Sequence, residues 1–198
     1  MLVDYEIKEL IRTCRIDIKP PPMAIEGTSI DLTLGNSFAF YQSKAARDPD
    51  CGCIKGDLNI LYPNSENEAV AFTAEALELE PGETILATTE QYIRLPDDIT
   101  GVLGGTSSLA RLFVLAHVTA PKIHPGFDGQ ITLELVNLNS NSKVSLYAGM
   151  KIATLSLFQH KTCETPYRGK YNGQTGATPV RVCSDIRQDV GDLGGVSS

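Results

Sequence analysis

The chain has 198 residues, of which 42% are apolar and 21% charged, a composition ordinary for one globular domain with a sizeable core. A formal net charge of −7 argues against a nucleic-acid partner, and no apolar run is long enough to span a bilayer. The first residues lack the apolar core of a signal peptide, and the five cysteines are scattered, so we expect a cytoplasmic protein with no membrane partner.

A short amphipathic helix is predicted at the start of the chain. Ile7, Leu10 and Ile11 recur at the spacing of one helix face. Asp4 is the candidate N-cap, and Pro20–Pro22 are expected to end the helical segment. This stripe predicts one helix face packed on a core.

A series of short strands is predicted after the helix. Ser29–Gly35 alternates apolar and polar residues, and short apolar runs between turn dipeptides recur from Ala69 to Phe158. The polar residues 43–68 are predicted to form a long excursion or loose hairpin, with Cys51 and Cys53 as two thiols in a loop rather than half of a metal site. Many strands, one opening helix and no alternation of strands with helices predict a mainly β fold, a sandwich or barrel.

The segment Gly104–Leu112, GGTSSLARL, predicts a turn into a short helix capped by Ser107 or Ser108. Amides at a helix N-terminus, hydroxyls and Arg111 could together hold a phosphate. The glycines are not followed by Gly-Lys-Ser/Thr, so this is no Walker A loop, and an ordinary capped turn is the simpler interpretation.

The segment PGFDG predicts a hairpin turn that leads into the strand Gln130–Asn137. Alternate residues from Ile131 to Leu135 share one face of that strand, and Thr132, Glu134 and Val136 share the other. In isolation, Glu134 is a solvent-facing strand residue. If its face lines a cleft, its carboxylate could instead act as a general acid and base.

The segment Thr165–Arg181 mixes cations, tyrosines and an amide with glycine and proline. It is either an ordinary basic loop or a mobile lid over an anionic ligand. Residues 182–198 are small and polar and are predicted to be a disordered extension, so the domain is expected to span residues 1–181. The three histidines match neither the metalloprotease nor the zinc-deaminase signature.

Taken in chain order, several segments resemble the dCTP deaminase family of the dUTPase-like superfamily. They are SIDLTLG, LEPGETILATTEQYIRLPDDITGVLGGTSSLARL, HVTAPKIHPGFDGQITLELVNLN, AGMKIATLSLF and KYNGQTGATPVR. The resemblance runs from the first residues to about Arg181. It implies a distorted β-barrel or jelly roll, assembled as a homotrimer with active sites between subunits.

The resemblance also implies an enzyme that hydrolyses dCTP to dUTP and ammonia without zinc, feeding dUMP and dTTP synthesis. Mg²⁺ would be bound through the triphosphate, and dTTP, an inhibitor of many such relatives, is a candidate ligand. Glu134 matches the catalytic glutamate. Ser107 and Ala120 match positions that hold the attacking water, Ala120 through its carbonyl, and Arg111 matches the residue that supports the carboxylate. Nucleotide contacts are implied for Thr106, Ser107, Ser108, Arg111, His124, Thr132, Leu133, Tyr167, Lys170 and Gln174.

Two departures from the family pattern matter most, and Thr33, where relatives often have Arg, is a third and milder one. Thr106 stands where relatives carry Arg or Lys, and loss of that cation would weaken phosphate binding by about 1–3 kcal/mol. His124 replaces an aspartate that meets the sugar and, in bifunctional and dUTPase relatives, directs the water that attacks the phosphate chain. The leading hypothesis is therefore a dCTP deaminase. The alternatives are a bifunctional dCTP deaminase/dUTP diphosphatase or dUTPase, and a catalytically silent nucleotide-binding relative.

Overall fold

The computed structural model describes residues 1–41 and 69–179. The excursion predicted at 43–68 with its cysteine pair, and the extension predicted at 182–198, lie outside the described residues. Of two compact units, the first comprises Met1–Phe40 and Ala71–Thr178 and carries every predicted site residue.

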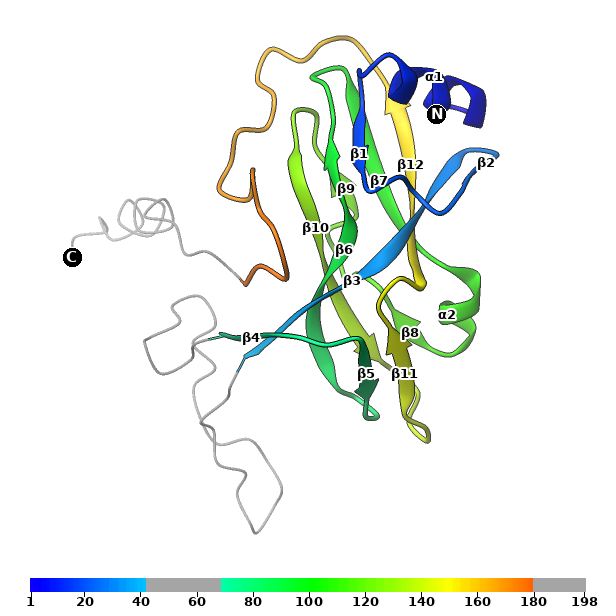
Figure 1. Ribbon diagram of the computed structural model, residues 1–198, viewed down its shortest axis with the longest axis vertical. Coiled ribbons are helices and arrows are strands. Elements are labelled where there is room, and N and C mark those ends of the chain that lie inside the picture. Colours follow the sequence, from blue (N-terminus) through cyan, green and yellow to red (C-terminus); the bar gives the residue numbers. More distant parts are fainter. Residues whose placement is uncertain (42–68, 180–198) are drawn as a thin grey trace, which may run out of the picture. The chain divides into compact units, whose positions relative to one another are not determined.

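Strands dominate the described residues, and a short helix precedes them (Figure 1), which confirms the predicted mainly β fold. None of the helices in these residues is long and apolar enough to cross a membrane. The elements in chain order are α1 (Asp4–Arg12), β1 (Asp17–Lys19), β2 (Ile25–Glu26), β3 (Ser29–Tyr41), β4 (Ala69–Thr73), β5 (Ala76–Leu79), β6 (Thr84–Arg94), β7 (Ile99–Gly105), α2 (Ser107–Arg111), β8 (Val114–Leu115), β9 (Lys122–Ile123), β10 (Asp128–Asn137), β11 (Val144–Tyr147) and β12 (Lys151–Gln159).

Helix α1 begins at Asp4, but Asp4 is not its cap. The N-cap residue is Val3, whose N–H donates to the Glu6 carboxylate at 2.9 Å, as a glutamate three residues into a helix commonly allows. Ile7 is fully buried, as the predicted stripe requires. The helix ends at Arg12, well before the prolines that were expected to end it.

The main sheet runs in the order β8-β10-β6-β3-β12-β7-β9, so β9 and β10 lie near its opposite ends. Only the turn at His124–Phe127 joins them. A flat sheet would separate these strands by about 24 Å, whereas the backbone from Ile123 to Asp128 reaches about 18 Å at most. The sheet therefore curls into a half-barrel.

This topology corrects the hairpin predicted at PGFDG. The turn is present, and Gly126 takes a positive φ of 79° there. The strands on either side of it do not pair with each other, because β9 pairs with β7 and β10 pairs with β6.

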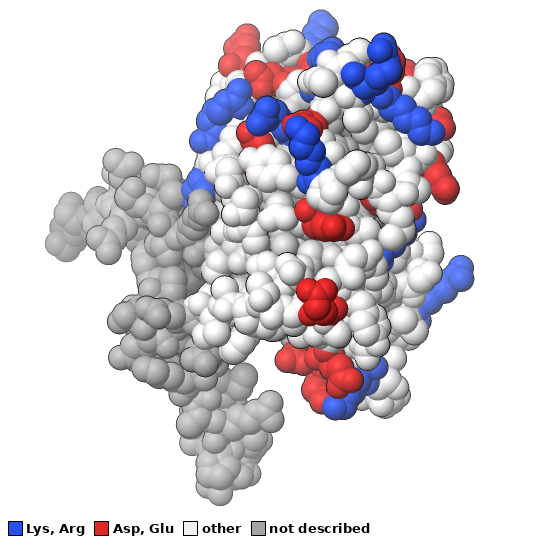
Figure 2. Space-filling model, viewed as in Figure 1, with Lys and Arg blue, Asp and Glu red and all other residues white. Residues whose placement is uncertain are grey.

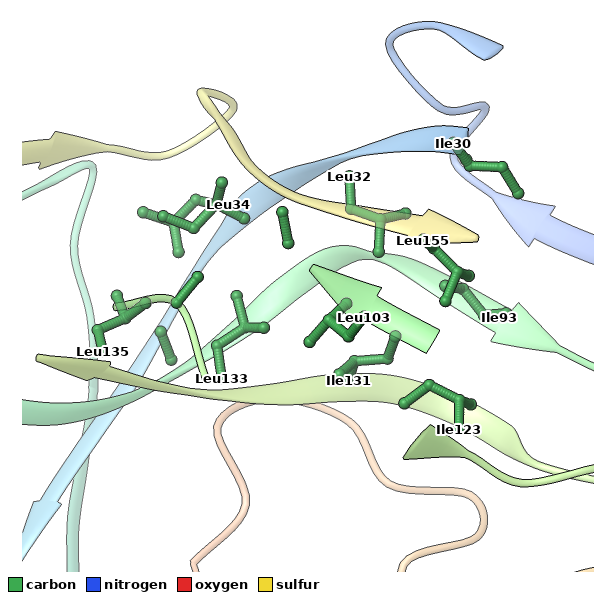
Figure 3. Close-up of a cluster of buried hydrophobic side chains, with 14 of the residues drawn as sticks. Ile30, Leu32, Leu34, Ile93, Leu103, Ile123, Ile131, Leu133, Leu135 and Leu155 are labelled. Atoms are coloured by element: carbon green, nitrogen blue, oxygen red, sulfur yellow. The ribbon is translucent and has the colours of Figure 1, made fainter. Parts of the chain in front are cut away.

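Alternate residues of β3 and β10 face each other across the core (Figure 3). Ile30, Leu32 and Leu34 of β3 are 0% exposed. Ile131, Leu133 and Leu135 of β10 are 4% exposed or less. Burial of each such side chain contributes about 1.5–3 kcal/mol. The burial of β10 alternates as predicted, which places Glu134 on the opposite face of that strand, whereas in β3 Asp31 and Thr33 of the other face are buried as well.

Candidate active site

Glu134 lies on the outer face of β10, where it meets the loop that follows β8. Leu115 pairs with Val136, and this antiparallel register carries the loop back past Glu134. The N–H of Val118 donates to Oε2 of Glu134 at 3.4 Å, and the glutamate is half-buried. Ala120 follows on the same loop. The fold therefore brings Glu134 close to the segment that carries Ala120.

The open edge of β10 near Glu134 is a second feature of this face. β8 pairs with β10 only at Val136 and Asn137 among the described residues. On its other side, β10 pairs with β6, with Thr132 opposite Thr88. The backbone around Thr132 and Leu133 thus has no neighbouring strand on one side, although the Thr132 hydroxyl there accepts the N–H of Thr178 at 3.3 Å. A planar ligand could hydrogen-bond to this backbone.

Helix α2 forms where GGTSSLARL predicts it, but its cap is Thr106. The Thr106 hydroxyl accepts the N–H of Leu109 at 3.3 Å, and only 8% of this residue is exposed. The prediction of Ser107 or Ser108 as the cap was therefore wrong. A short side chain with an oxygen suits this position, and the long cation that the resemblance leads one to expect here would not cap the helix in this way.

The polar residues of α2 do not reach Glu134 within one copy of the chain. Ser107, Ser108 and Arg111 are all exposed, and no hydrogen bond joins them to the glutamate in the described residues. Arg111 forms no ion pair with any residue that the structure describes. Apolar side chains around them are also exposed: Leu112, Phe113, Leu115, Val118 and Leu138.

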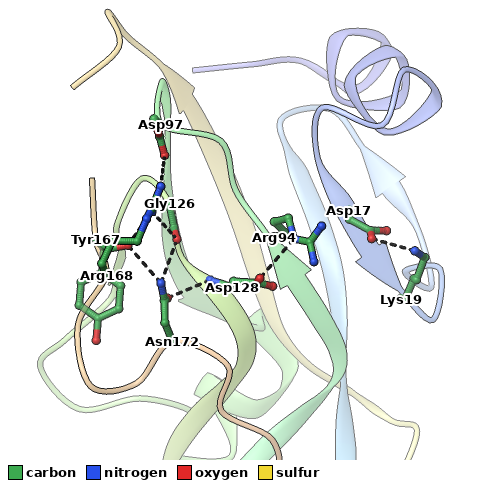
Figure 4. Close-up of polar contacts among 9 residues, drawn as sticks. All are labelled: Asp17, Lys19, Arg94, Asp97, Gly126, Asp128, Tyr167, Arg168 and Asn172. Atoms are coloured by element: carbon green, nitrogen blue, oxygen red, sulfur yellow. Dashed lines mark hydrogen bonds and ion pairs between the residues drawn. The ribbon is translucent and has the colours of Figure 1, made fainter. Parts of the chain in front are cut away.

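The tail, residues 165–178, lies against the turn that precedes β10 (Figure 4). The rings of His124 and Tyr167 stack with centroids 5.9 Å apart and planes 23° apart. Arg168 donates to the carbonyl of Gly126 and pairs with Asp97, each at 3.2 Å. A Cβ at position 126 would displace the flexible Arg168 guanidinium from this contact, and the positive φ of 79° also favours glycine there.

Asn172 and Asp128 extend the same network toward β6. The Asn172 side chain accepts the Asp128 N–H at 3.1 Å and donates to the carbonyls of Gly126 and Tyr167 (Figure 4). Asp128 pairs with Arg94 at 3.3 Å. Burial, and then a hydrogen bond to Asp128, raises the pKa of Tyr92 above its ordinary value.

The remaining tail residues of the predicted site differ in exposure. Lys170 is exposed, with Nζ 5.3 Å from the centroid of the Tyr171 ring. Gln174 is only 6% exposed, and its side-chain amide donates to the carbonyl of Gln130 at 2.7 Å. Gln130 was not among the predicted site residues, because glutamine in an alternating strand carries no distinctive signal.

A cavity of about 510 Å³ lies beside Gln130 and Gly176. Among the described residues, its lining includes the carboxylates of Glu75 and Glu90 and contains no Lys, Arg or His. These two carboxylates would repel a triphosphate, so this lining does not suit the phosphate chain.

Positive charge is local on the face shown in Figure 2. Lys and Arg gather toward the end of the unit that carries α1, among acidic residues, and the middle of this face is mostly uncharged. In the described residues, no three His, Cys, Asp or Glu side chains cluster as metal ligands would.

Comparison with known proteins places this arrangement in a family. A model of the dCTP deaminase-like family matches residues 1–160. A dUMP-forming dCTP deaminase of Dictyoglomus thermophilum is 37% identical over 196 residues, covering 94% of this chain and 96% of that protein. A dCTP deaminase of Colwellia psychrerythraea is 36% identical over 192 residues, covering 93% and 96%.

A solved structure shares the fold. The dCTP deaminase from Agrobacterium tumefaciens superposes with a TM-score of 0.56 at 18% identity over 79% of this chain. The present chain spans 46% of that chain's length. The family match over most of the sequence confirms the resemblance seen in its motifs, and the chain belongs to the dCTP deaminase-like family.

Proposed function

We propose that this protein is an enzyme that deaminates dCTP hydrolytically, giving dUTP and ammonia. The observation that carries the proposal is the placement of Glu134, half-buried on the outer face of β10 and bonded to the loop that leads to Ala120. The names of the relatives, dCTP deaminases from several organisms, support the same substrate.

Glu134 supplies the base and acid of the reaction. Its carboxylate takes a proton from water as the oxygen adds to C4 of cytosine, and the proton passes to N3 of the ring. A second proton transfer through Glu134 lets the 4-amino group leave as ammonia. The Ala120 carbonyl and the Ser107 hydroxyl orient the water, and Arg111 holds the carboxylate in place.

Completion of this site requires a neighbouring subunit. Ser107 and Arg111 are exposed and do not contact Glu134 within one copy. The exposed apolar side chains around α2 are suited to burial against a second copy. In the homotrimer that we propose, α2 of one subunit faces Glu134 of another.

The nucleotide would lie along the start of β10. The open backbone edge at Thr132 and Leu133 would bind the base, and His124 would meet the sugar. Lys170 and Tyr167 would contact the triphosphate, whereas Gln174 could do so only by giving up its bond to Gln130.

Thr106, Ser107 and Ser108 begin α2 and would lie near the phosphates. Mg²⁺ would bind through the phosphate oxygens, since this ion usually keeps several waters and needs no protein cage. dTTP, which has the same triphosphate and sugar, would compete for the site.

A second candidate is a bifunctional enzyme that converts dCTP to dUMP. The name of the Dictyoglomus thermophilum relative favours it. His124 favours deamination alone, because an imidazole stacked on Tyr167 stands where the resemblance places an aspartate that directs water to the phosphate chain.

Product analysis tests both candidates. The protein is incubated with Mg²⁺ and either dCTP or dUTP, and nucleotides and phosphates are resolved by ion-exchange chromatography. We expect dUTP and ammonia from dCTP, with added dUTP left intact. Release of dUMP and pyrophosphate would establish the bifunctional enzyme. Binding of dCTP without turnover would indicate a silent relative and contradict the proposal.

A further inference from the structure

We propose that Gln130 is a positioning residue. Its hydrogen bonds to Gln174 and Gly176, here called the clasp, hold the tail against β10 and thereby set the affinity for nucleotide. The inference rests on the proposed function, because it assumes that the docked tail contacts the substrate. Gln130 stands at a β-bulge, where the register between β10 and β6 shifts between Gln130 and Thr132. The extra residues belong to β6, where Thr89 to Gln91 stand between the partners of Gln130 and Thr132, whereas β10 keeps its regular alternation.

The Gln130 side chain joins β6 to the tail. Its Nε2 donates to the carbonyls of Thr89 at 3.0 Å and Glu90 at 3.1 Å. Its Oε1 accepts the N–H of Gly176 at 2.7 Å. Both N–H donors and the oxygen of the amide are therefore engaged, and no apolar residue of similar size could make these contacts.

The Gln130 backbone holds the tail as well. Its N–H donates to the carbonyl of Gln174 at 2.9 Å, and the Gln174 side chain donates back to the Gln130 carbonyl at 2.7 Å. Further along, two residues beyond Gln130 and four beyond Gln174, the N–H of Thr178 donates to Thr132 Oγ1 at 3.3 Å. The tail thus runs beside β10 to within two residues of Glu134.

A tail that these hydrogen bonds hold in place before substrate binds has already met part of the cost of its ordering. Tyr167 of the same tail stacks on His124, where the proposed function places the sugar and phosphates. If fewer tails are docked, the apparent affinity falls in proportion to the docked fraction. Chemistry at Glu134 is then unchanged once the substrate is bound.

The test compares Gln130→Met with Gln159→Met in the full chain. Gln159 is an exposed amide on β12 that donates to Asp98 and does not contact the tail. Docking of the tail onto β10 is measured without nucleotide, as the rate at which trypsin cleaves the tail after Arg168 and Lys170. Loss of the amide contacts should raise both the cleavage rate and KM for dCTP by about tenfold. We expect kcat to stay within about twofold, and Gln159→Met to resemble the wild type.

Two outcomes would overturn the inference. One is unchanged cleavage and KM in Gln130→Met. The other is a Gln130→Met variant with a lower melting temperature and a smaller fraction of active protein but an unchanged KM. That result would assign Gln130 a purely structural role. If the wild-type chain does not turn over dCTP, the proposed function fails, yet the cleavage assay still decides whether Gln130 clasps the tail.

A second variant, changed in the tail, distinguishes loss of the tail contacts from loss of stability in β10. Gly176 has a φ of +70°, and a Cβ there would lie 2.9 Å from Ser37 Oγ, so Gly176→Ala should release the tail without changing β10. If Gln130 acts through the tail, Gln130→Met should add little to the KM of Gly176→Ala. If the increase in KM of the double variant equals the product of the increases in the two single variants, the inference is contradicted.

Discussion

The main-chain N–H of Val118 lies 3.4 Å from Oε2 of Glu134, a contact between residues sixteen positions apart. It gives the glutamate a partner on a loop outside its own strand. Glu134 is therefore half-buried beside that loop, whereas a simple alternating strand would leave it facing solvent. This placement makes its carboxylate the first group to test.

Replacing Glu134 with Gln should abolish most of the turnover of dCTP. The amide keeps the shape of the side chain but cannot accept a proton from water, so kcat should fall by about 10²–10⁴ while KM changes little. Steady-state kinetics with dCTP checks this. Glu26→Gln, an exposed carboxylate on β2, is the matched control. Turnover near the wild-type rate would remove Glu134 from the mechanism.

Replacing Thr106 with Ala should destabilise the protein through the N-terminus of α2. The lost hydroxyl leaves the N–H of Leu109 unpaired, and such caps contribute about 0.5–2 kcal/mol to the free energy of unfolding. Thr106→Ser keeps the hydroxyl and should lose much less. Urea denaturation of both variants makes the comparison, and equal stability of the Ala and Ser variants would contradict the capping role.

Replacing His124 with Asp should increase hydrolysis of the phosphate chain. The change supplies a carboxylate at the position where the resemblance expects one, and a correctly placed base typically contributes about 10²–10⁴ in rate. We expect at least about a tenfold rise in pyrophosphate release from dUTP, measured by a coupled phosphate assay. His124→Asn has the same shape without the charge and should show no gain. An equal gain in both variants would mean that removal of the imidazole, not the carboxylate, matters.

The Arg15–Asp98 pair should make stability depend on pH. Arg15 Nη2 lies 2.7 and 2.8 Å from the two Asp98 oxygens, and this contact holds the pKa of Asp98 below its ordinary value of 3.8. Since the folded pKa is lowered, the stabilisation is complete well above pH 3.8 and is lost as pH falls through the folded pKa. We expect Asp98→Asn to lower the free energy of unfolding by about 1 kcal/mol at pH 7.

Denaturation at several pH values measures this dependence. The difference between Asp98→Asn and the wild type should shrink as the pH is lowered below 3.8. Asp17→Asn is the control, because its ion pair with Lys19 is more exposed and should contribute less (Figure 4). A difference that stays constant between pH 7 and pH 3 would show that the charge of Asp98 does not carry the effect.

Local sequence patterns determined the strand faces and the class of fold. The alternation in β3 and β10 decided which residues enter the core, because successive side chains of a strand point to opposite faces. The same pattern placed Thr132 and Glu134 together on the outer face. The order of the motifs further identified the family and Glu134 as its catalytic candidate.

Only the tertiary structure decided which distant segments meet. It paired β9 with β7 instead of β10, moved the cap of α2 to Thr106, and brought Val118 to Glu134. Gln130 also took its role from contacts with Thr89 and Gly176, which lie 41 and 46 positions away in the chain. Periodicity reports how a segment orients its own side chains, but these partners depend on how the sheet curls, and that is a property of all its strands packed together.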